Sequence, residues 1–142
     1  MKIRFLIILS LTILIGFLSA KIVHAFYTEN KNNFNVYVLE AGPYEENIVK
    51  EKEKQFDYYV TYKDNESIYI ICGISTSLDN INKLKKIYSD TDIKVKSKYI
   101  DNQEFITNLE QYDLLLKEVN NKKDLLSINK VILSSYEDLG IS

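Results

Sequence analysis

Two segments of the 142-residue chain repeat one pattern, and this repeat constrains the fold more than any other feature. Residues 36–42 and 68–73 are each a run of β-branched and aromatic residues that carries a tyrosine and stops at a glycine. Tyr37 and Tyr69 are 32 positions apart, and a helix-like stretch follows each glycine. Because the chain has only four glycines, composition alone does not explain this placement. A strand, a glycine and a helix used twice predict an α+β domain with two related halves.

The patterns along residues 34–99 predict the element order β-α-β-β-α-β. Strand-forming composition predicts strands at 34–41, 57–63, 68–74 and 93–99. Apolar residues at helical spacing predict helices at 45–56 and 78–88. This order is the split βαβ arrangement. We therefore expect a ferredoxin-like fold, in which a four-stranded antiparallel sheet carries both helices on one face and leaves the other face open to solvent.

The C-terminal part, residues 101–142, predicts two further amphipathic helices. Asp101 and Glu104 have the spacing of a capping box at the start of the first helix. Asn120 and Asn121 interrupt the pattern, and the second helix ends near Gly140, a residue suited to a C-terminal cap. These helices are compatible with packing on the core and with binding a partner, and the sequence leaves both open.

The first 27 residues predict a membrane anchor. Lys2 and Arg4 precede an apolar run at 5–20, and apolar character resumes at 22–27. A bilayer core about 30 Å thick needs roughly 17–25 helical residues, which the two runs supply together. Preceding basic residues place the N-terminus in the cytoplasm and the remainder outside. The alternative is a signal peptide cleaved near Ala25. Either reading exports residues 34–100 and the extension at 101–142, after a polar linker at 28–33.

Composition argues against several classes of function. A net charge of −2 and a pI near 5.5 argue against a nucleic-acid partner. One cysteine, Cys72, and one histidine, His24, cannot build a Cys/His metal site or a Ser-His-Asp triad in the exported domain. Glu45 and Glu46 are adjacent, so they do not face each other as a hydrolase pair must. We therefore expect no enzyme activity, no metal and no cofactor.

The strand–glycine repeats at 36–44 and 68–74 resemble the sporulation-related repeat (SPOR) family of bacterial cell-envelope domains. The resemblance covers residues 35–100. It implies a domain that binds peptidoglycan, typically glycan strands stripped of peptide stems, at division or sporulation septa, and a single-span anchor agrees with it. Glu40 stands where the family often has glutamine, Tyr44 where it has an aromatic residue, and Ile71 where it often has arginine.

The expected ligand site lies on the open face of the sheet. Alternation along the strands places one set of side chains there if Ala41 and Cys72 face the helices. Tyrosine rings stack on sugar rings, and a carboxylate hydrogen-bonds their hydroxyl groups. The expected glycan-binding residues are Glu40, Tyr69, Ile71, Tyr59 and Tyr62.

The lysine row at 94–98 and the function of the whole domain each have two possible interpretations. Alternating Lys94, Lys96 and Lys98 favour a solvated strand edge over contact with an anionic wall polymer. For the domain as a whole, the alternative to glycan binding is a protein–protein interaction module of an envelope or sporulation complex, which would use the sheet face or the C-terminal helices.

Overall fold

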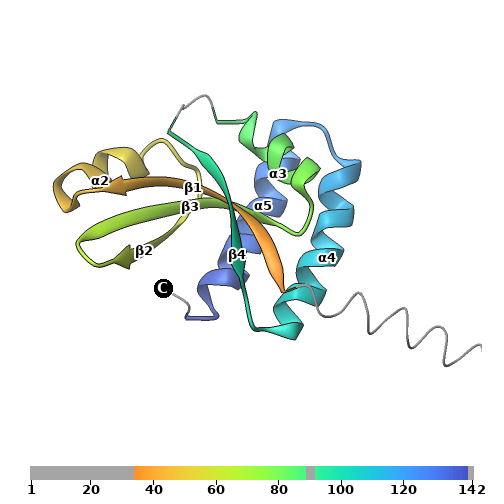
Figure 1. The fold of residues 1–142 in the computed structure, drawn as a ribbon. Helices are drawn as coiled ribbons and strands as arrows, with labels where there is room; N and C mark the ends of the chain where they lie inside the picture. The colour runs from red at the N-terminus through yellow and green to blue at the C-terminus, as the bar shows by residue number, and fades with distance from the viewer. Residues whose placement is uncertain (1–33, 89–91, 141–142) are drawn as a thin grey trace, which may run out of the picture. The chain divides into compact units, whose positions relative to one another are not determined.

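The structure is a computed structural model, and it describes residues 34–88 and 92–140. A four-stranded antiparallel sheet lies at its centre (Figure 1). Its neighbouring strands follow the order β2-β3-β1-β4, and each adjacent pair is antiparallel. The strands are β1 (Asn35–Tyr44), β2 (Val60–Asp64), β3 (Ser67–Ser75) and β4 (Lys94–Tyr99). The α+β class and the antiparallel sheet predicted from the sequence are confirmed.

The helices follow the predicted succession along the chain. They are α2 (Glu46–Glu53), α3 (Leu78–Lys85), α4 (Gln103–Glu118) and α5 (Lys122–Glu137). Asn102 caps α4, because its backbone is extended and its side chain accepts a hydrogen bond from the Phe105 N–H at 2.8 Å. The prediction of Asp101 as the cap is therefore wrong by one residue. Asn121 caps α5 in the same way, through the Asp124 N–H.

The two glycines of the repeat serve different steric needs. Gly42 has φ +120°, and a Cβ there would lie 3.0 Å from the backbone oxygen of Ile68. This position therefore demands glycine for the backbone itself. At Gly73 a Cβ would lie 3.0 Å from Leu39 Cδ1 and 3.4 Å from Leu84 Cδ1. Gly73 thus lets α3 pack closely against β1 and β3.

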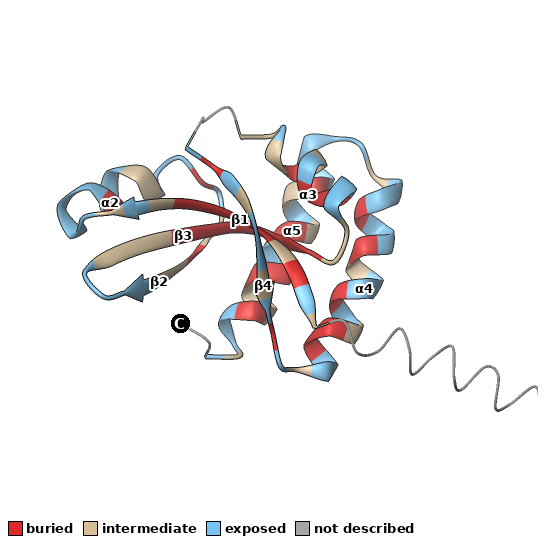
Figure 2. Ribbon diagram, viewed as in Figure 1, coloured by how far each residue is buried: buried red, intermediate tan, exposed pale blue. Residues whose placement is uncertain are grey.

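The sheet face that carries Glu40 is covered in its middle. Val38 pairs with Ile74 and Glu40 with Ile71, so these residues share that face, and their apolar members are at most 1% exposed. Figure 1 shows α5 crossing behind the sheet, where it packs against β3 and β2, and Figure 2 shows the buried residues concentrated along β1 and β3. The expectation of an open face is therefore wrong here, because α5 buries its own apolar stripe against it.

Polar contacts fix the C-terminal helices to β3. Strand β2 pairs with β3 only up to Ile71, so within the described residues the carbonyl of Cys72 meets no strand on that side. Instead it accepts from Asn129 Nδ2 of α5 at 2.8 Å and from the Tyr88 hydroxyl at 3.3 Å. Asn129 thereby ties α5 to a backbone carbonyl that strand pairing leaves unsatisfied on this side, and Tyr88 supplies a second donor to it.

Asp113 makes a second connection between α4 and the sheet. It is 7% exposed and accepts hydrogen bonds from Ser75 Oγ, from Thr76 N and Oγ1 at 2.7 and 2.6 Å, and from Asn80 Nδ2 at 3.1 Å. A buried carboxylate needs such donors to offset its lost hydration. Together the described residues from 34 onward form one compact unit that includes α4 and α5.

None of the helices within the described residues is long and apolar enough to cross a membrane. The predicted anchor at 1–27 and the linker at 28–33 lie outside the described residues.

Candidate ligand-binding site

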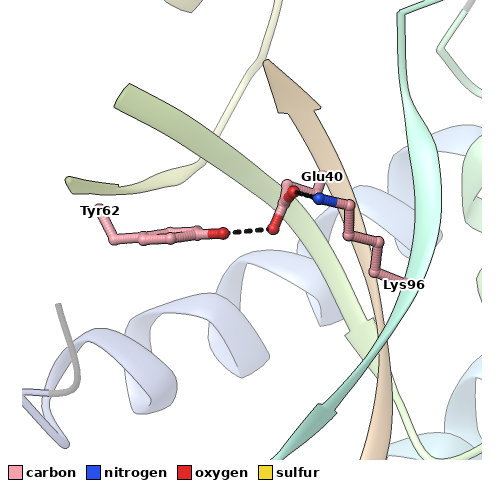
Figure 3. Close-up of polar contacts among 3 residues, drawn as sticks. All are labelled: Glu40, Tyr62 and Lys96. Carbon is pink, nitrogen blue, oxygen red and sulfur yellow. Dashed lines mark hydrogen bonds and ion pairs between the residues drawn. The ribbon is translucent and has the colours of Figure 1, made fainter. Parts of the chain in front are cut away.

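Glu40 is the centre of a side-chain cluster that joins three strands. It lies in β1, is 5% exposed, and holds a carboxylate with partners on both sides. The Tyr62 hydroxyl of β2 donates to Oε2 at 2.5 Å, and Lys96 Nζ of β4 forms an ion pair with Oε1. Figure 3 shows Tyr62 and Lys96 approaching Glu40 from opposite sides. The buried negative charge is thus satisfied by one neutral and one cationic donor.

Two stacked tyrosine rings lie beside this carboxylate. Tyr62 and Tyr69 are cross-strand partners in β2 and β3, and their ring centroids are 5.1 Å apart with 12° between the planes. Lys96 Nζ lies 5.3 Å from the Tyr69 centroid, and Lys98 Nζ lies 4.4 Å from the Tyr62 centroid. Both tyrosines are half-buried, so part of each ring contacts solvent.

We call this cluster the tyrosine platform, and its residues are Tyr62, Tyr69, Glu40, Lys96 and Lys98. Tyr136 of α5 lies at its border, with its ring centroid 5.6 Å from Lys98 Nζ. Tyr136 is 1% exposed, so the accessible surface of the platform ends where α5 begins. The accessible surface is therefore a margin of the sheet rather than its whole face.

The electrostatics of the platform fix the protonation of two groups. Burial raises the pKa of the Tyr62 hydroxyl, and the hydrogen bond to the Glu40 carboxylate raises it further. The hydrogen bond to Glu40 also raises the pKa of the Lys96 ammonium. At neutral pH Tyr62 is therefore a neutral hydroxyl whose O–H donates to Glu40, and Lys96 is a cation.

The structure brings together three of the five residues predicted from the sequence. Glu40, Tyr62 and Tyr69 belong to the platform. Ile71 shares their face but is fully buried, so its assignment as a ligand contact is wrong. Its apolar side chain is part of the core that α5 covers.

Tyr59 lies apart from the platform. The strand predicted at 57–63 begins only at Val60, so Tyr59 lies outside β2 and strand pairing does not align it with Tyr62. Its ring centroid lies 6.4 Å from that of Phe56, beyond the end of α2. The sequence offered Tyr59 and Tyr62 as equivalent candidates, and the start of β2 at Val60 separates them.

Lys96 and Lys98 were missed as site residues. Their alternation in sequence indicated a shared face, which is correct, but favoured a solvated edge. Lys96 is 56 positions from Glu40, and only the pairing of β4 with β1 places the two together. Lys94, one step further along β4, is exposed and matches the solvated-edge interpretation.

The single cysteine of the chain, Cys72, is buried in β3. Burial raises the pKa of the Cys72 thiol to about 12, so the thiol is protonated and unreactive at neutral pH. Residues 34–88 and 92–140 contain no group of three or more His, Cys, Asp or Glu side chains that would hold a metal ion.

Comparisons with protein-family models, with curated proteins and with solved structures gave no match. The function of the tyrosine platform must therefore be argued from its own geometry.

Proposed function

We propose that this chain is a membrane-anchored, extracytoplasmic binding module without catalysis of its own, and that its tyrosine platform binds peptidoglycan glycan strands. The resemblance to the SPOR family motivates the proposal, including a role in cell division or sporulation. The half-exposed stack of Tyr62 and Tyr69 beside two lysines is the observation that carries it. The succession of β1, α2, β2, β3, α3 and β4 supports a variant of the ferredoxin-like fold.

Aromatic rings and cations suit this ligand for separate reasons. The apolar face of a pyranose ring packs on a tyrosine ring, and the phenolic edge remains available for hydrogen bonds. Removal of a peptide stem leaves a carboxylate on the lactyl group of muramic acid. Lys96 and Lys98 are the cations that lie beside the platform rings, and they would pair with such carboxylates. The glycan would contact only the margin of the sheet, because α5 covers the middle.

A sacculus pull-down tests the proposal. The full chain in detergent micelles would be incubated with intact and with amidase-treated sacculi, which differ in their peptide stems. We expect stronger retention on the treated sacculi, because these carry the additional lactyl carboxylates. A correctly folded chain that is retained on neither preparation would contradict the proposal.

A pair of matched variants locates the contact. Tyr69→Ser removes one ring of the stack, and we expect about fivefold weaker retention, corresponding to ~1 kcal/mol for one aromatic contact. Tyr99→Ser is the control, because Tyr99 is 61% exposed on β4 and is not part of the platform. Equal losses in the two variants would show that the tyrosine platform is not the contact surface.

A second candidate function is a protein-interaction module, and exposed apolar residues favour it. Leu114 and Leu115 are adjacent in α4 and are 66% and 52% exposed. A photo-crosslinking side chain at position 114, compared with one at exposed Glu118 on the same helix, would test this candidate. A defined protein adduct from position 114 alone supports it, and adducts from neither position argue against it.

A further inference from the structure

A pocket separate from the tyrosine platform lies between α5 and two loop segments. Its volume is about 310 Å³, at the small end of the range of roughly 300–1,000 Å³ for small-molecule sites. Residues 123, 126, 127 and 130 of α5 line it, and their spacing places them on one face of the helix. Asp57 and Tyr58, which precede β2, and Tyr88, which follows α3, form its other walls. A pocket of this size suits a ligand of one or two amino-acid residues rather than a polymer.

Both signs of charge border the pocket without neutralising each other. Asp57, Lys123 and Lys130 line it and are exposed. In the part of the chain that the structure describes, none of the three takes part in an ion pair. Lys130 Nζ lies 5.7 Å from the ring centroid of Tyr58, over one wall. One carboxylate and two ammonium groups are thus available to a ligand that carries both charges.

The uncharged lining residues of the pocket supply the remaining contacts. Tyr58, Tyr88 and Leu126 offer apolar surface to the body of a ligand. Asn129 also lines the pocket and is 1% exposed; its Nδ2 donates to the Cys72 carbonyl, and within the described residues its Oδ1 has no hydrogen-bond partner. A buried acceptor without a donor is unfavourable, so a ligand N–H group that reaches Asn129 Oδ1 would be stabilised there.

We propose that this pocket binds a small zwitterion, either a free amino acid or a short peptide that carries a free ammonium group and a free carboxylate. Asp57 pairs with the ammonium group, and Lys123 and Lys130 pair with the carboxylate. The apolar body of the ligand lies between Tyr58 and Leu126. This inference does not depend on glycan binding at the tyrosine platform, because the two sites share no residue.

The test is a titration of the full chain in detergent micelles, followed by NMR at the backbone amide of Ser127 and the side-chain amide of Asn129. The probes are alanine, alanyl-alanine, N-acetyl-alanyl-alanine and alanyl-alanine amide. We expect saturable shifts with one or both of the unblocked compounds, and the better of the two identifies the source of the ligand. Each blocked dipeptide should bind at least about tenfold more weakly, because it lacks one of the charges.

Two variants make the assignment of charges specific. Asp57→Asn should bind alanyl-alanine and its N-acetyl form equally, because the partner of the ammonium group is gone. Lys123→Gln/Lys130→Gln should likewise lose the preference for the free carboxylate over the amide. Asp138→Asn and Lys117→Gln are the controls, since both residues are exposed and neither lines the pocket.

Three results would overturn the inference. One is the absence of saturable shifts with either unblocked compound up to roughly 10 mM. Another is equal affinity of the blocked and unblocked dipeptides. The third is an unchanged preference in both pocket variants while circular dichroism shows them folded. Retention on sacculi is measured separately and depends on Tyr69, so failure of one proposal leaves the other intact.

Discussion

Replacing Lys96 tests how the platform holds a buried carboxylate. Lys96→Met keeps the length of the side chain but removes its charge and its donors. Glu40 is 5% exposed, and among the described residues the Tyr62 hydroxyl is then its remaining side-chain donor. A hydrogen bond to a charged group contributes about 1.5–3 kcal/mol, so we expect the free energy of unfolding to fall by that amount. The unfolding equilibrium constant should rise about 10- to 150-fold.

The reciprocal change should cost less. Glu40→Gln leaves Lys96 without its anion, but the Lys96 side chain is 49% exposed and water can solvate its ammonium group. The glutamine amide retains an acceptor for the Tyr62 hydroxyl. We therefore expect a loss of only about 1 kcal/mol. The double variant should reveal a coupling energy of at least about 1 kcal/mol between the two positions.

Urea unfolding, followed by tyrosine fluorescence and circular dichroism, measures these differences, and the chain has no tryptophan to complicate the signal. Lys94→Met is the matched control, since Lys94 is an exposed lysine on the same strand, and we expect a change within about 0.5 kcal/mol. The denaturant dependence should stay constant across the series. The reasoning is refuted if Lys96→Met costs no more than Lys94→Met, or if Glu40→Gln costs more than Lys96→Met.

Three further predictions follow from other parts of the structure. Asp113→Ala should lower the free energy of unfolding by about 3–5 kcal/mol in urea titrations, because four donors lose their buried acceptor. The control is Asp138→Ala, since Asp138 is exposed, and similar losses in both variants would contradict the assigned contacts. Folding raises the pKa values of Tyr62 and Tyr88, chiefly through burial, so the stability that these two groups contribute should be constant below the unfolded tyrosine pKa of about 10 and fall as pH rises above it. The measurement is the free energy of unfolding at pH 8 to 11. The decline should be shallower in the Tyr62→Phe/Tyr88→Phe variant, and a decline of equal slope there would show that these tyrosines do not cause it. Gly42→Ala should lower the free energy of unfolding by at least about 1 kcal/mol more than Gly140→Ala in the same assay, roughly the cost of a strained backbone with a close contact. Both glycines have positive φ, but of the two only Gly42 has a backbone oxygen at 3.0 Å from the added Cβ. Equal losses in the two variants would refute the steric argument.

Local patterns predicted most of the elements because they depend on near neighbours. Alternation along β4 and helical spacing in α3 and α4 report which side of an element is apolar, and neighbouring residues alone determine that. The glycine repeat correctly marked two strands followed by helices. The sequence predicted Asp101 as the cap of α4, and the structure has Asn102. The choice between adjacent polar residues depends on the exact course of the preceding backbone.

The candidate site was only partly predictable. The sequence displays alternation within each strand, and Glu40, Tyr62 and Tyr69 share a face because β3 pairs with both β1 and β2. Lys96 joins them only because β4 pairs with β1, and Ile71 is lost from the site only because α5 covers it. Tyr59 is separated from Tyr62 because β2 begins at Val60, three residues later than the sequence pattern predicts.

The sequence by itself determined the order of strands and helices, the need for glycine within the repeat, and a content of one cysteine and one histidine, which is too small for a Cys/His metal site. Each of these depends on residue type and on spacing over a few positions. The tertiary structure alone decided that α5 lies on the predicted open face and that Lys96 pairs with Glu40. Both are contacts between segments far apart in the chain, and they form because buried apolar and charged surfaces complement each other across that distance, which local periodicity does not encode.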